Sequence, residues 1–153
     1  MTLKIEFTLS DNCDIGYFDD FCRGHLTITG RQASITSLGR HPDQSMMIVL
    51  SLVELLDGIR RFLRGELGCV YQFVGVDSSF EFQVAKTTFD TVEVKSYRGI
   101  IDEVSTSELV LAVLNGTTQF LTRYGQWIGQ GEIASEDLQN AIQSFKEEFF
   151  GRQ

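Results

Sequence analysis

Apolar and polar residues alternate along several short segments of the chain. An alternation with a period of two is typical of half-buried β-strands. In residues 2–9 the apolar side chains Leu3, Ile5, Phe7 and Leu9 share one face, while polar side chains occupy the other. This segment is therefore predicted to be the first strand.

More strands are predicted further along the chain. Residues 25–29 and 33–37 are rich in β-branched side chains and flank a Gly-Arg pair, a pattern that predicts a β-hairpin. Three later strand-like segments are joined by short polar turns: residues 69–76, 80–86 and 91–97. In the second of these, Lys86 is expected to face water. Because the links are short, the strands are expected to form an antiparallel meander.

The apolar spacing changes in residues 46–63, where apolar side chains recur every three or four positions. This spacing predicts an amphipathic helix. Asp43 or Ser45 is the expected N-cap, and Gly65 is the expected C-terminal stop. The helix is apolar enough to be the central, largely buried helix of the fold.

The last third of the chain predicts two more helices. Ser105 or Ser107 can cap the first, and Ser135 is the expected N-cap of the second. Gly116 lies inside the first of these helices. A glycine there costs about 1 kcal/mol relative to alanine, so a kink or break at this position is left open.

The order of strands, helix, strands and helices predicts an α+β fold. The expected architecture is an antiparallel sheet of about five or six strands, with a central helix and C-terminal helices packed on it. The chain has 153 residues, of which 42% are hydrophobic. This is enough apolar material for one core, so residues 1–153 are expected to form a single domain.

Net charge narrows the classes of partner. The chain has 13 Lys and Arg against 21 Asp and Glu, which gives a net charge of −8. A negative long-range field repels DNA, RNA and anionic lipid, so no nucleic-acid or membrane partner is expected. No apolar run approaches the roughly 20 residues of a membrane span, and the first residues lack the apolar stretch of a signal peptide. With three cysteines, an odd number, the expectation is a soluble, reduced, cytoplasmic protein.

Catalytic and metal-binding patterns are weak. Cys22 and His25 lie three positions apart, which places them on opposite faces of a strand and disfavours a nucleophile–base pair. Cys13, Cys22 and His25 do not have the spacing of a zinc site, and residues 11–22 lack the oxygen ligands of a calcium loop. We therefore expect no catalytic residue, no metal and no cofactor.

Three arginines, Arg60, Arg61 and Arg64, lie near the end of the predicted central helix. They could bind an anion. Their placement is also the ordinary one for cations in the last turn of a helix, where the dipole favours positive charge, and this structural interpretation is preferred.

The most distinctive segment is residues 11–21, which combines acidic and aromatic side chains. Charged groups steer association with an oppositely charged partner, and rings supply contact area. The alternative is that the rings anchor a loop to the core while the acids keep it soluble. The candidate partner-binding residues are Asp11, Asp14, Tyr17, Phe18, Asp19 and Asp20.

The chain resembles a group of small acidic bacterial proteins that includes the immunity proteins of contact-dependent and polymorphic toxin systems. The resemblance rests on Leu-Lys-Ile-Glu-Phe at 3–7, Leu-Val-Glu-Leu-Leu-Asp-Gly-Ile at 52–59, Phe-Glu-Phe-Gln-Val at 80–84, and the capped helix at 105–124. It implies a non-catalytic protein that occludes one toxin domain, often a basic nuclease. No individual functional residue is carried over.

Two other classes of function stay open. One is a small enzyme or ligand-binding domain whose site lies in a cavity between sheet and helices. The other is a structural subunit whose exposed apolar residues mediate self-association.

Overall fold

The computed structural model describes residues 2–10, 21–127 and 133–151. These residues form three α-helices and two antiparallel sheets of four strands each, so the predicted α+β class is confirmed. The strands are divided between two sheets, whereas a single sheet of five or six strands was expected. Periodicity identifies strands but does not say which strands pair, and this is the source of the difference.

The first sheet is centred on β2 (Arg23–Thr29). From Gly24 to Thr29, β2 pairs with β1 (Lys4–Leu9). It also pairs at one end with β3 (Ser34–Thr36) and at the other with β4 (Met46–Met47). The predicted first strand and the predicted hairpin are both present.

The second sheet is a meander in the order β5-β6-β7-β8. Its strands are β5 (Val70–Val74), β6 (Glu81–Lys86), β7 (Thr91–Ser96) and β8 (Gly99–Ser105). The first three were predicted. In β8 the consecutive residues Ile101 and Asp102 are both buried, so this strand lacks a clear alternation and was missed.

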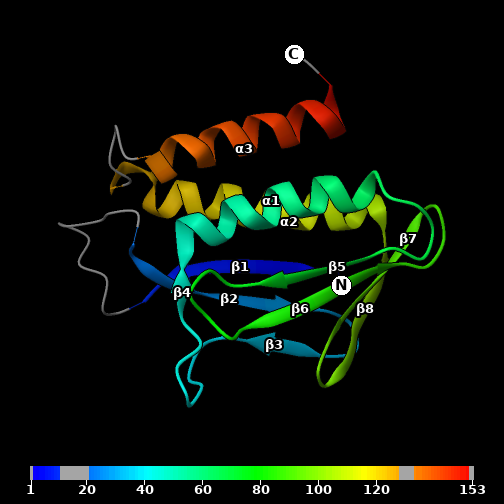
Figure 1. Ribbon diagram of the computed structural model, residues 1–153, viewed down its shortest axis with the longest axis horizontal. Helices are drawn as coiled ribbons and strands as arrows, with labels where there is room; N and C mark the ends of the chain where they lie inside the picture. The colour runs from blue at the N-terminus through cyan, green and yellow to red at the C-terminus, as the bar shows by residue number, and fades with distance from the viewer. Residues whose placement is uncertain (1, 11–20, 128–132, 152–153) are drawn as a thin grey trace.

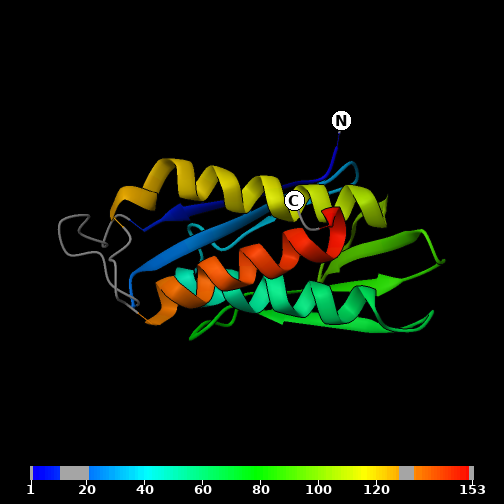
Figure 2. The same ribbon diagram turned by 90° about the horizontal axis from the view of Figure 1, so that it is seen from above.

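The helices are α1 (Ile48–Leu63), α2 (Thr106–Tyr124) and α3 (Ile133–Phe150), with a short 3-10 turn, η2 (Gly125–Trp127), after α2. Figure 1 shows three layers: the strands, then α1 and α2, then α3. Seen from above, α3 lies between α1 and α2 (Figure 2), and it packs mainly on α1. The helix α1 covers β5, and α2 covers β1.

Two of the predicted helix caps are wrong. The N-cap of α1 is Met47, which makes no side-chain cap hydrogen bond, because residues 46–47 form β4 and delay the helix beyond Asp43 and Ser45. Ser135 lies buried within α3 and is not its cap. For α2, the prediction of Ser105 is confirmed, because its hydroxyl accepts a hydrogen bond from the Glu108 amide at 3.0 Å.

The core is one cluster of buried side chains that joins both sheets and all three helices. On α1, Leu52, Leu55, Leu56 and Ile59 have no exposed surface, so α1 is the central buried helix that the sequence predicted.

The helix α2 continues without a break through Gly116. A Cβ atom at this position would lie 2.4 Å from the carbonyl oxygen of Ile5 in β1. The absence of a side chain therefore allows the helix to approach the strand closely, and this contact explains a glycine in the helix interior.

Lys86 does not face water, contrary to the prediction, because only 9% of it is exposed. Its Nζ donates to the carbonyl oxygens of Leu63 at 2.9 Å and of Gly65 at 2.8 Å. These carbonyls lie at the C-terminal end of α1, where the helix dipole favours a cation. The strand residue thus supplies the positive charge at the end of the helix.

Across the described ranges, no helix combines the length and apolar character needed to span a membrane. Cys69 is a free thiol, whereas Cys22 is disulfide-bonded. The expectation of reduced cysteines is therefore not met at Cys22.

Candidate partner-binding site

The predicted partner-binding residues fall in the connection between β1 and β2, and they lie outside the described residues: Asp11, Asp14, Tyr17, Phe18, Asp19 and Asp20. The structure describes the frame that holds this connection. Leu9 pairs with Gly24 at the ends of the two strands. The Ser10 amide then donates to the Arg23 carbonyl at 3.0 Å, so the connection starts and ends at neighbouring strand ends.

The return end of the connection is also held in place. The Cys22 carbonyl accepts a hydrogen bond from the Ile48 amide at 3.1 Å. Phe21, the last aromatic residue of the acidic and aromatic segment, is 66% exposed. At this one position the ring is therefore not a core anchor.

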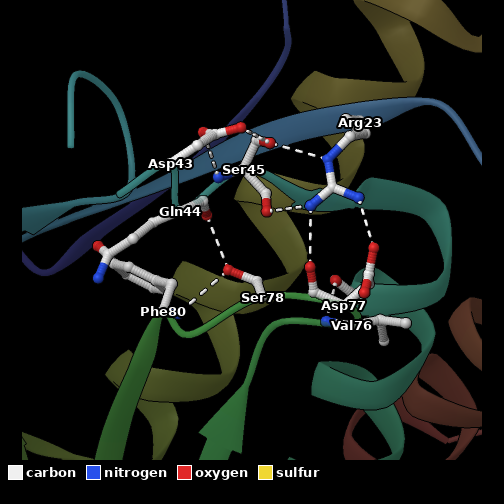
Figure 3. Close-up of polar contacts among 9 residues, drawn as sticks. Arg23, Asp43, Gln44, Ser45, Val76, Asp77, Ser78 and Phe80 are labelled. Carbon is white, nitrogen blue, oxygen red and sulfur yellow. Dashed lines mark hydrogen bonds and ion pairs between the residues drawn. The ribbon is translucent and has the colours of Figure 1, made fainter. Parts of the chain in front are cut away.

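Arg23, the first residue of β2, is the centre of a polar cluster beside this frame (Figure 3). Its Nε donates to Ser45 Oγ at 2.8 Å, and its Nη1 donates to Asp77 Oδ2 at 2.8 Å. Its Nη2 donates to the carbonyl oxygens of Ser45 at 2.6 Å and Asp77 at 2.9 Å. All three guanidinium nitrogens donate hydrogen bonds, so Arg23 joins β2 to Ser45 before β4 and to Asp77 in the turn between β5 and β6.

The carboxylate of Asp43 organises the loop before β4. Its oxygens accept hydrogen bonds from the Ser45 amide at 2.9 Å and from the Ser45 hydroxyl at 2.8 Å. These two bonds stabilise the ionised carboxylate, and they hold the pKa of Asp43 below its ordinary value of 3.8.

The turn between β5 and β6 completes the cluster. Ser78 Oγ donates to the Gln44 carbonyl at 2.8 Å and accepts from the Phe80 amide at 3.1 Å. Asp77 adopts a positive φ of 57°, a left-handed conformation that aspartate tolerates better than most residues. The cluster therefore links the first sheet to the second at the end where the β1–β2 connection begins.

The sequence did not single out Arg23 and Asp77. They lie 54 positions apart, and only the packing of the two sheets brings them together. The one sequence signal was the Asp-Ser-Ser turn at 77–79, which was assigned only as a connection.

The histidines offer no accessible catalytic pair. His25 Nδ1 lies 3.0 Å from Ser37 Oγ, but the same oxygen accepts from the Leu26 amide, and Ser37 has no exposed surface. A substrate could not reach this hydroxyl, so the pair is structural. His41 lies exposed in the loop that precedes β4.

In the part of the chain that the structure describes, no group of three or more His, Cys, Asp or Glu side chains could hold a metal ion. Arg60 and Arg64 both pair with Glu148 of α3. Arg61 pairs with Glu54 at 3.8 Å. This agrees with the structural interpretation of the arginine cluster.

Three hollows lie along α2. One of about 280 Å³ lies between the N-terminal end of α2, the end of α3 and Lys86. Another of about 430 Å³ lies between α2 and β1, and a third of about 550 Å³ lies between α2 and the end of α3. All three are open at the surface, and their lining residues do not identify a small ligand.

Comparison with protein-family models, with curated proteins and with solved structures gives no match for this chain. The site is therefore interpreted from its own residues.

Proposed function

We propose that the protein is a non-catalytic binding protein of the immunity type, which neutralises a basic toxin domain by occluding it. The partner would contact the β1–β2 connection, with the aspartates steering association and Tyr17 and Phe18 supplying the contact area.

One observation carries this proposal. Residues 11–20 concentrate acidic and aromatic side chains in a chain of net charge −8. The described frame supports it, because the connection begins and ends at paired strands that the Arg23 cluster holds against the second sheet. The paired strand ends therefore fix where the segment leaves and rejoins the first sheet.

The test uses the protein encoded next to this chain in its genome. That protein is expressed in a bacterial host with and without the chain, and growth and complex formation are measured. If the proposal holds, growth arrest by the neighbouring protein is relieved and the two proteins co-purify. A neighbour that is harmless, or that arrests growth equally in both strains, contradicts the proposal.

The surface is tested by binding kinetics with the same pair. Changing Asp11, Asp14, Asp19 and Asp20 to Asn is expected to lower the association rate and its salt dependence, whereas Phe18→Ala is expected to raise the dissociation rate. The matched control removes four exposed acids elsewhere: Glu66→Gln, Glu81→Gln, Asp90→Asn and Glu136→Gln. If both sets lower the association rate equally, the net charge of the protein, and not this segment, is the cause of the change. If the rings anchor the loop instead, Phe18→Ala lowers thermal stability and leaves binding unchanged.

A further inference from the structure

The strand β5 forms one edge of the second sheet and pairs only with β6 among the described residues. The Gly75 amide donates to the Phe80 carbonyl, which marks this as a hydrogen-bonded pair of the antiparallel ladder. Such pairs alternate along a ladder. Tyr71 and Phe73 therefore direct their backbone groups toward β6.

The intervening residues, Val70, Gln72 and Val74, direct their backbone N–H and C=O groups away from β6. The next residue in this series, Val76, shows the direction, because its amide donates to Ser51 Oγ and its carbonyl accepts from the Met47 amide. These two contacts close the edge at Val76. No described residue pairs with the backbone of β5 in the same way.

The open part of the strand also carries no charged side chain, and two of its three outward residues are valines. Val70 is 56% exposed and Val74 is 43% exposed. The strand reads Val-Tyr-Gln-Phe-Val, without the lysine, proline or bulge that usually protects an edge from pairing with another chain. A strand of this kind is a template for strand addition.

We propose that the occupant of this edge is the β5 strand of a second copy of the chain, paired antiparallel about a two-fold axis at Gln72. This register places Gln72 opposite Gln72 and Val70 opposite Val74. All three residues that direct backbone groups outward then form hydrogen-bonded pairs, and each pair exchanges two hydrogen bonds. The result is one continuous sheet across both copies.

The sequence of β5 favours a copy of itself over another strand. The strand Val-Tyr-Gln-Phe-Val reads nearly the same in both directions, so this register places each residue opposite one of its own kind. Two chains of net charge −8 repel each other, and β5 itself adds no charge to that repulsion. Self-association through β5 is independent of the proposed toxin binding at the β1–β2 connection.

The experiment is sedimentation equilibrium of the whole chain over a range of concentrations up to millimolar. A dimer is expected, and Val70→Lys with Val74→Lys is expected to weaken it about tenfold or more, because lysines then face lysines across the axis. Val70→Lys with Val74→Glu is expected to restore it, because each lysine then faces a glutamate. Both positions are exposed, so the fold tolerates these changes, as circular dichroism will show.

Amide hydrogen exchange gives a second measurement of the register. On dimerisation, the amides of Val70, Gln72 and Val74 are expected to gain protection, whereas those of Tyr71 and Phe73 are already protected by β6. A control variant, Gln139→Lys with Gln143→Lys, adds the same charge on the exposed face of α3 and should leave the dimer unchanged. A monomer at every concentration overturns the proposal. So does a dimer that ignores the lysine pair, or one that the lysine–glutamate pair fails to restore.

Discussion

The Nζ of Lys86 donates a hydrogen bond to the carbonyl oxygen of Leu63 at 2.9 Å. A residue of β6 therefore supplies the hydrogen-bond donor for a carbonyl at the C-terminal end of α1. Together with its bond to Gly65, this contact joins the second sheet to the central helix. A buried ammonium held by two carbonyls has a structural role that its position in a predicted half-exposed strand did not reveal.

We expect Lys86→Met to lower the free energy of unfolding by about 1–3 kcal/mol, because it removes the hydrogen-bond donor to two partly buried carbonyls at the end of α1. Urea denaturation measures the difference. The control is Lys95→Met on the neighbouring strand, whose ion pair with Glu93 is partly exposed and 3.9 Å long. Equal losses in the two variants would show that Lys86 has no special role.

Gly116→Ala is expected to destabilise the protein, although alanine is the better helix former. Helix propensity alone would stabilise the variant by about 1 kcal/mol. The added Cβ would instead lie 2.4 Å from the Ile5 carbonyl oxygen and push α2 away from β1. Thermal unfolding of Gly116→Ala is compared with that of Asn115→Ala, at the adjacent exposed position, which should be neutral or stabilising. Stabilisation by both changes would contradict the close contact.

Asp43 is expected to make stability depend on pH in the acid range. Its folded pKa lies below the ordinary value of 3.8 because Ser45 donates two hydrogen bonds to the carboxylate. The unfolded chain therefore takes up this proton first as the pH falls, and the stabilisation present above the unfolded pKa is lost as the pH falls through the folded pKa. Above about pH 6 the group contributes no slope.

The measurement is the free energy of unfolding between about pH 2 and pH 6 for the parent and for Asp43→Asn. The variant should lose less stability on acidification than the parent. Asp90→Asn, at an exposed acid in the turn before β7, is the control and should follow the parent. An Asp43→Asn curve as steep as that of the parent would exclude this contribution.

Leu56→Ala is expected to cost about 2–5 kcal/mol, because it leaves a cavity in the centre of the core. Leu56 has no exposed surface. Leu111→Ala in α2, where the leucine is 47% exposed, should cost much less. Similar melting temperatures for both variants would mean that α1 is peripheral.

Periodicity predicted the elements whose faces are cleanly divided between core and water. The helix α1 and the strand β1 belong to this group. The strand β8 does not, because Asp102 is buried beside Ile101 and accepts hydrogen bonds from Arg31 at 3.1 Å and 3.3 Å. The contacts with Arg31 stabilise a carboxylate in the core. The sequence around Asp102 does not indicate this ion pair.

The candidate site was predictable in composition but not in geometry. The acids and rings of residues 11–20 are visible in the sequence, whereas the Arg23 cluster depends on contacts between segments far apart in the chain. The N-cap of α1 was misassigned for a similar reason, since Met46 and Met47 pair with β2 before the helix begins.

The contact between α2 and β1 has a consequence for how the protein is made. The Leu3 amide donates to Glu108 Oε2 at 3.4 Å, across 105 positions of the chain. During translation, the apolar face of β1 leaves the ribosome long before α2 exists to cover it. The apolar face of β1 therefore cannot be covered co-translationally until α2 (Thr106–Tyr124) has been synthesised, and in that interval Ile5 and Phe7 are expected to be a binding site for chaperones.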